Sequence, residues 1–281
     1  MVFLLSACAV QRDVVDVGPE KAQDVEPAKT KAVAPVEAAS RSLGVGKLED
    51  WVRSACLREA SSLRRVDTIS EKLMCKPMFE GLVDSAAEMG RRLEGSKYCV
   101  AQGFDTGAYQ EAMVTALRVE VIRGRAFTDH ALGQLKSDDP EKDSCNWASQ
   151  RKLGALVKKC QWFRAATASD RNAALRDLMR RSGIRSAEKF KQKLVENASD
   201  CTGYYTGYMA ASFFEGYNSA YCADSVRGNG PLDGGDDIMM QKLAALTENL
   251  EEALDSKPGR SNEPVSPHLY PLMVDAFPCG G

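Results

Sequence analysis

The chain has 281 residues, a formal net charge of −2 and a hydrophobic content of 44%. This content is enough for a hydrophobic core, and the near-neutral charge gives no sign of the basic face that nucleic-acid binding needs. No apolar run reaches the roughly 18 residues of a membrane-spanning helix, so none is predicted.

The first eight residues are an apolar run ending in Leu-Ser-Ala-Cys8, and they resemble a bacterial lipobox in which the cysteine is lipidated. The run is short and lacks a basic start, so we expect the true start codon to lie upstream. Residue 9 is Ala rather than Asp, which by the same resemblance favours anchoring to the outer membrane of a Gram-negative bacterium. The alternative is a short apolar N-terminus with a chance cysteine.

Residues 9–45 are rich in Ala, Val, Pro and charged residues and contain almost no large apolar side chain. Such a segment cannot bury enough surface to fold and is predicted to be a disordered tether. From residue 46 onward, apolar residues recur at helical spacing, and the Val/Ile/Thr alternation of strands is nearly absent. We expect an all-α protein with helices at about 48–63, 77–93, 106–117, 128–136, 153–163, 169–183, 186–198, 201–222, 236–254 and 267–277.

Nine cysteines occur, and removal of the lipobox cysteine leaves eight, an even number that suits four disulfides in an oxidising compartment. A zinc site is disfavoured because no Cys-x-x-Cys pair is present and the histidines are only His130 and His268. The remaining cysteines are Cys56, Cys75, Cys99, Cys145, Cys160, Cys201, Cys222 and Cys279.

Alignment of these cysteines reveals an internal repeat. In each half, an aromatic residue follows one cysteine by four positions and a glycine by six, and the next helix ends in Ser-x-Tyr-Cys. The equivalent pairs are Cys56 with Cys160, Cys75 with Cys201, Phe79 with Tyr205, Gly81 with Gly207, Cys99 with Cys222 and Cys145 with Cys279. The sequence therefore predicts two helical units, 46–145 and 146–281, the second carrying an inserted helical hairpin between Cys160 and Cys201.

Helix geometry restricts the disulfides. A straight helix from Cys75 to Cys99 would hold them about 27 Å apart, whereas a disulfide needs Cα atoms within about 7 Å. This excludes a pairing of the second cysteine with the third in either unit and leaves two pairings per unit. One joins first with third and second with fourth; we prefer the other, which gives Cys56–Cys75, Cys99–Cys145, Cys160–Cys201 and Cys222–Cys279.

The second unit carries a further pattern. It begins with Cys201-x-Gly-Tyr-x-x-Gly and continues as a helix to Tyr-Cys222, a variable loop and a long amphipathic helix. It ends with Leu269-x-x-Leu-Met-x-x-Ala-Phe-Pro-Cys279. This pattern resembles the Tai/Rap immunity proteins, which protect bacteria against amidase effectors of the type VI secretion system. The resemblance covers about residues 150–281 well. It covers 46–145 loosely, since Pro77 and Met78 stand where the family has Gly and Tyr.

Members of this family are small all-helical periplasmic proteins that bind peptidoglycan-cleaving amidases and plug their active sites, often as dimers. The resemblance implies a disulfide-stapled helical bundle of two tandem Tai/Rap-like units, acting as a non-catalytic periplasmic lipoprotein with a protein partner and a homodimeric state. The alternative is a structural or envelope-maintenance lipoprotein, a scaffold or small chaperone, built on the same bundle.

No catalytic constellation is predicted, so we expect a protein that is not an enzyme and needs no cofactor or metal. Ser-x-x-Lys occurs at Ser149 and Ser186, both near expected helix starts, where serine acts as an N-cap. Eight paired cysteines would leave none free for a Cys–His nucleophile. The acidic stretch 233–237 lacks the spacing of a calcium loop and indicates a turn before a helix.

Long Gly-rich loops are either functional or merely tolerated. We interpret the Gly-rich stretch 227–235 as the best candidate for contact with a partner. The partner-binding residues expected there are Arg227, Asn229, Leu232 and Asp233.

Overall fold

The computed structural model describes residues 47–57, 65–93, 96–119, 122–140, 144–212, 221 and 236–278. These residues fall within one compact unit of the chain. Their nine α-helices are α2 (Lys47–Val52), α3 (Arg65–Arg92), α4 (Thr106–Arg118), α5 (Gly124–Gly133), α6 (Leu153–Thr167), α7 (Arg171–Ser182), α8 (Ala187–Ser212), α9 (Asp236–Ser256) and α10 (Ser266–Ala276). Two shorter turns, the π-helix η1 (Arg53–Leu57) and the 3₁₀-helix η4 (Pro258–Asn262), complete the set.

The all-α prediction is confirmed for the described residues. They form no strand and only isolated β-bridges, such as that between Tyr98 and Lys136. None of the described helices combines the length and apolar character that a membrane crossing requires.

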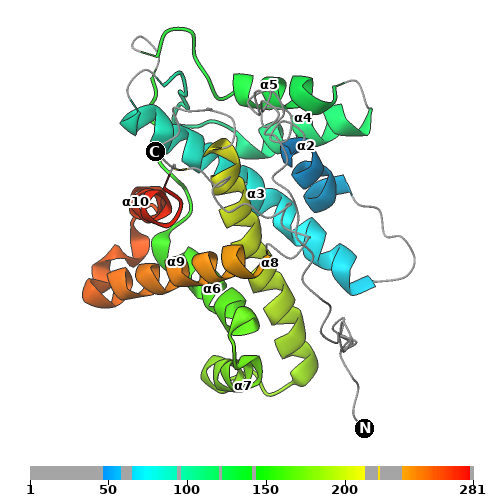
Figure 1. The fold of residues 1–281 in the computed structure, drawn as a ribbon, viewed down its shortest axis with the longest axis vertical. Helices are drawn as coiled ribbons and strands as arrows, with labels where there is room; N and C mark the ends of the chain where they lie inside the picture. Colours follow the sequence, from blue (N-terminus) through cyan, green and yellow to red (C-terminus); the bar gives the residue numbers. More distant parts are fainter. Residues whose placement is uncertain are drawn as a thin grey trace, which may run out of the picture. The chain divides into compact units, whose positions relative to one another are not determined.

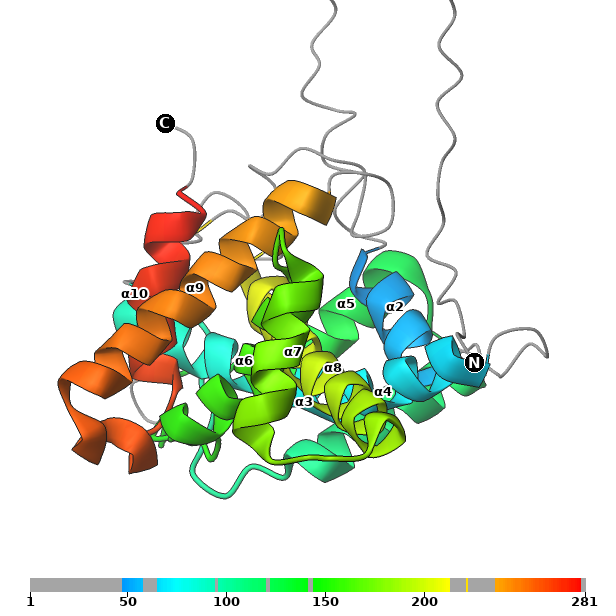
Figure 2. The ribbon, with the colours of Figure 1, turned by 90° about the horizontal axis from the view of Figure 1, so that it is seen from below.

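Helices α3 and α8 cross at the centre of the bundle and form its most extensive contact (Figure 1). Figures 1 and 2 both show α2, α4 and α5 on one side of this pair and α9 and α10 on the other. Helix α6 packs along α8, and α9 packs on α6. The largest fully buried side chains are aromatic and include Tyr98, Tyr204, Tyr205, Tyr208, Tyr221, Phe79, Phe127, Phe163 and Phe277.

Glycines permit the close approach of α3 and α8. A Cβ on Gly81 would overlap the carbonyl oxygen of Tyr204, and a Cβ on Gly207 would overlap the carbonyl oxygen of Met78. Gly81 with Gly207, and Met78 with Tyr204, occupy equivalent positions of the repeat. The two contacts are therefore reciprocal, because each joins a glycine of one helix to the position of the other helix that the repeat makes equivalent. The division into two units remains a prediction.

The preferred disulfide pairing is confirmed at three of its four bridges. Cys56–Cys75, Cys99–Cys145 and Cys160–Cys201 have Cα separations of 5.0, 4.7 and 5.0 Å. Two of them are equivalent in the repeat, since one ties η1 to α3 and the other ties α6 to α8. Cys222 and Cys279 lie outside the described residues, so the fourth bridge stays a prediction, as does the lipidation of Cys8.

Several helix boundaries differ from the sequence-based expectation. Helix α5 spans Gly124–Gly133, where a helix at about 128–136 was expected. Helix α3 begins at Arg65, so Pro77 lies inside it and not in its first turn. The turn before Pro77 is held by the bridge at Cys75 and by the contact of Met74 with Gly203, which together offset the lost backbone hydrogen bond. Helix α8 runs unbroken through Cys201, where two separate helices were expected.

Candidate functional site

The predicted partner-binding residues, Arg227, Asn229, Leu232 and Asp233, lie outside the described residues. The attachment points on either side of them are described. Before the loop, the Tyr221 hydroxyl is buried, donates to the carbonyl of Tyr208 at 2.9 Å and accepts from Ser85 Oγ at 2.6 Å. After it, α9 begins at Asp236. The loop is therefore attached to the helical core on both sides.

A buried carboxylate joins three separate parts of the chain. Asp84 of α3 is 2% exposed and accepts hydrogen bonds from Trp147 Nε1 at 2.8 Å, from Tyr204 Oη at 2.6 Å and from Ser149 Oγ. We call these four residues the Asp84 cluster. Trp147 and Ser149 belong to the connection between the two predicted units, and Tyr204 belongs to α8. The cluster thus fastens this connection to the crossing of α3 and α8.

The expected capping role of Ser149 is wrong. Helix α6 has Lys152 as its N-cap residue without a side-chain hydrogen bond, and the Ser149 hydroxyl is directed to Asp84. The satisfaction of a buried carboxylate outweighs local capping here, because an unpaired buried carboxylate would be far less favourable than an uncapped helix end. Ser186 does cap, since its Oγ accepts from the backbone nitrogen of Lys189 at 3.3 Å.

Arg151 continues this network towards the surface. Its guanidinium pairs with Glu80 of α3 and Asp200 of α8 and lies over the ring of Tyr204, 4.8 Å from the centroid. Burial lowers the pKa of Arg151, but the two carboxylates outweigh that effect and raise its pKa above the ordinary value. The arginine therefore stays charged and links the two central helices.

The Asp84 cluster is better suited to structure than to catalysis, because its polar atoms are sealed in the core and bonded to one another. Sequence reasoning did not find it. The available signal was a single acidic residue in the apolar stretch 82–87 of a helix. Its partners lie more than 60 positions away, and nothing local identifies them.

Burial raises the pKa of Asp84, against the opposing effect of the hydrogen bonds from Ser149, Tyr204 and Trp147. The folded state therefore keeps this proton to a higher pH than the unfolded chain does. The contribution of Asp84 to stability is full below its ordinary pKa of 3.8 and falls as the pH rises through the raised value. The pH dependence is opposite for exposed Asp177, because hydrogen bonding from Arg180 lowers its pKa. Its contribution to stability is therefore lost as the pH falls.

We expect Asp84 and Asp177 to change the pH dependence of stability in opposite directions. The measurement is the free energy of unfolding against pH for the wild type, Asp84→Asn and Asp177→Asn. The advantage of the wild type over Asp84→Asn should shrink as the pH rises from 3.8. The advantage over Asp177→Asn should instead be lost as the pH falls below 3.8. Slopes of the same sign in both comparisons would contradict the assignment.

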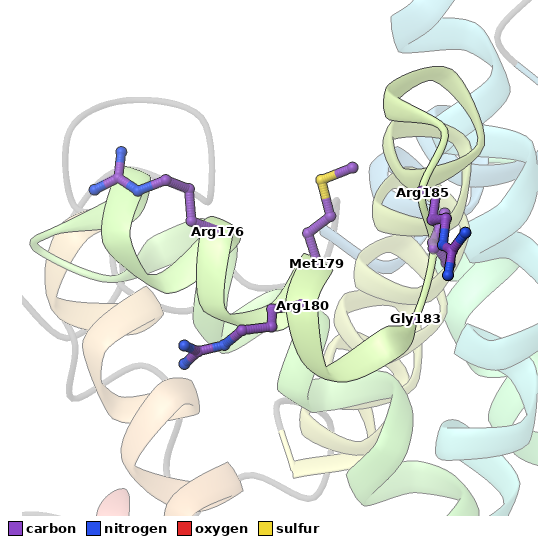
Figure 3. A pocket seen from close by; sticks show the side chains of 6 residues that line it. Arg176, Met179, Arg180, Gly183 and Arg185 are labelled. Atoms are coloured by element: carbon purple, nitrogen blue, oxygen red, sulfur yellow. The ribbon is translucent and has the colours of Figure 1, made fainter.

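A shallow hollow of about 530 Å³ lies at the turn from α7 to α8 (Figure 3). Its lining residues are Arg176, Met179, Arg180, Gly183, Ile184 and Arg185. Figure 3 shows the three guanidinium groups pointing apart and not into a common space. A small-molecule site requires polar groups that converge within an enclosed cleft, so this hollow does not fit one.

The remaining candidates for chemistry are separate from one another. His130 lies beside Gln134, and His268 pairs with Glu263 at 2.7 Å on the surface. All the described cysteines belong to the three bridged pairs. The described part of the chain contains no cluster of His, Cys, Asp and Glu suited to a metal ion.

Comparisons of the chain with protein-family models, with curated proteins and with solved structures found no match. The fold and the bridges define an all-α, disulfide-stapled protein, and such bridges are consistent with an oxidising compartment outside the cytoplasm.

Proposed function

We propose that the chain is a non-catalytic periplasmic binding lipoprotein, which inhibits or docks a peptidoglycan-active protein as Tai/Rap immunity proteins do with amidase effectors. Three considerations support the proposal. The sequence pattern of residues 150–281 resembles that family, the bridges suit the periplasm, and inhibition by insertion into a cleft requires shape and an anchor, not a catalytic residue.

The observation that carries the proposal is the two-sided attachment of the predicted binding loop. Tyr221 holds one side through hydrogen bonds to α3 and α8, and α9, packed on α6, holds the other. A loop whose ends are fixed loses less conformational freedom on binding than a free segment does, and this favours affinity. The expected contact residues are Arg227, Asn229, Leu232 and Asp233.

The test is protection of cells. The full-length chain is exported together with type VI amidase effectors, first of all any encoded beside its own gene, and growth is recorded. We expect protection, and inhibition of peptidoglycan cleavage by the purified proteins at equimolar ratio. The loop variant Arg227→Glu/Asp233→Arg should lose both effects.

A matched variant, Arg118→Glu/Asp255→Arg, makes the same charge changes at exposed positions of α4 and α9 and should protect as the wild type does. Absence of protection and of inhibition for the wild-type chain would contradict the proposal. The structural or envelope-maintenance role would then be pursued through the envelope defects of a strain lacking the gene.

A further inference from the structure

The hairpin formed by α7 and the first turns of α8 carries a dense positive charge. Between residues 171 and 193 the chain has eight basic and two acidic residues, a net charge of +6, whereas the whole chain carries −2. All eight basic residues are exposed, and we call them the basic band: Arg171, Arg176, Arg180, Arg181, Arg185, Lys189, Lys191 and Lys193. Helix α7 lies at one end of the bundle (Figure 1).

Little of this charge is neutralised within the protein. Asp177 pairs with Arg180 at 2.5 Å and with Arg181 at 2.8 Å, and Glu196 pairs with Lys193 at 2.6 Å. The other five basic residues of the band form no ion pair with another described residue. The Arg180 side chain, although paired, is 82% exposed. The band therefore presents its charge to the solvent.

The apolar face of the hairpin is already occupied. Leu178 of α7 packs with Ala165 of α6 and Phe190 of α8 in a small cluster separate from the main core. Within the described residues, the large hydrophobic side chain that is exposed is Val119, after α4 and outside the hairpin. The basic band thus lacks the apolar anchor on which a specific protein interface depends.

The guanidinium groups of Arg176, Arg180 and Arg185 point apart, as Figure 3 shows. They do not converge on a single anion, so an extended layer of separate anionic charges matches the band better than one small anion does. A layer of lipid head groups binds clusters of Lys and Arg through charge alone, without a shaped pocket or an apolar anchor. A protein interface would require both shape and an anchor.

We propose that the basic band is a membrane-facing surface, which binds the anionic phospholipid head groups of a bilayer. This goes beyond the proposed function, because it requires neither an amidase nor the loop at 227–235. Bound in this way, the hairpin would set the orientation of the helical bundle at the membrane surface. The attraction adds over the exposed charges and is screened by salt.

The experiment uses the full-length oxidised chain with Cys8→Ser, so that no lipid anchor contributes. Flotation is measured with vesicles of phosphatidylcholine alone and of phosphatidylcholine mixed with phosphatidylglycerol. We expect binding to the mixed vesicles only, weakening as salt is added. In Arg176→Glu/Arg180→Glu/Arg185→Glu the partition coefficient should fall at least about tenfold, because three attractive charges become repulsive.

A matched variant, Lys97→Glu/Arg118→Glu/Lys257→Glu, reverses three exposed charges outside the band and should float as the wild type does. Helical circular dichroism verifies that both variants fold. Equal binding of the two variants, or no binding of the wild type to mixed vesicles, would overturn the proposal. Loss of amidase inhibition in the band variant, without any vesicle binding by the wild type, would assign the band to an acidic protein partner instead. Loss of vesicle binding in the band variant with amidase inhibition retained would support the proposal independently of the proposed function.

Discussion

Replacement of Gly207 with alanine is expected to lower the free energy of unfolding by about 3 kcal/mol, at the upper end of the usual effect of overpacking. The added Cβ would overlap the carbonyl oxygen of Met78, at the crossing of α3 and α8. Both contacting groups belong to helix backbones, so neither can rotate away as a flexible side chain would. The measurement is urea unfolding of the oxidised protein, followed by circular dichroism.

The chain supplies two comparisons for this variant. Gly81→Ala meets the backbone of Tyr204 in the equivalent contact and should destabilise to a similar extent. Gly133→Ala adds the same methyl group in α5, where no heavy atom lies within 4 Å. The change at Gly133 should be neutral or stabilising by up to about 1 kcal/mol, because alanine loses less backbone entropy than glycine in a helix. Similar small effects at all three positions would rule out the close crossing.

Replacement of Asp84 with alanine should destabilise the fold by about 4 kcal/mol, since it leaves three buried donors without their acceptor. The donors are the indole nitrogen of Trp147 and the hydroxyls of Ser149 and Tyr204. The loss should be seen in urea unfolding at neutral pH. It should also loosen the connection between the two predicted units, detectable as faster amide hydrogen exchange around Trp147.

A double variant distinguishes the network from simple loss of packing. In Asp84→Ala/Ser149→Ala one donor is removed together with the acceptor, so the combined destabilisation should be smaller than the sum of the two single changes. Exposed Asp177→Ala serves as the control for loss of an aspartate and should leave the unfolding midpoint close to that of the wild type. Strict additivity of Asp84→Ala and Ser149→Ala would show that the hydrogen bond between them contributes nothing.

The sequence by itself determined the features that depend on neighbours within a few residues. Asp105 caps α4 by accepting from the backbone nitrogens of Gly107 and Ala108, and Gly183 ends α7 with a φ of 67°. The expected helices at about 106–117 and 169–183 have these same ends, because capping and left-handed backbone are local properties of the residue type. For the disulfides, helix geometry excluded one of the three pairings in each unit and left two open. The three described bridges agree with the pairing that we preferred.

Only the tertiary structure decided which polar residues the core would contain and what they would bind. Ser149 has the sequence context of a helix cap, yet a carboxylate 65 positions away receives its hydrogen bond. Pro77 has the context of a first turn, yet contacts made by its neighbours keep it within α3. The basic residues of 171–193 are visible in the sequence, but their common exposure follows from the packing of α7 on α6 and α8. Local patterns report short-range hydrogen bonds and periodicity, whereas burial and long-range pairing exist only once distant segments meet.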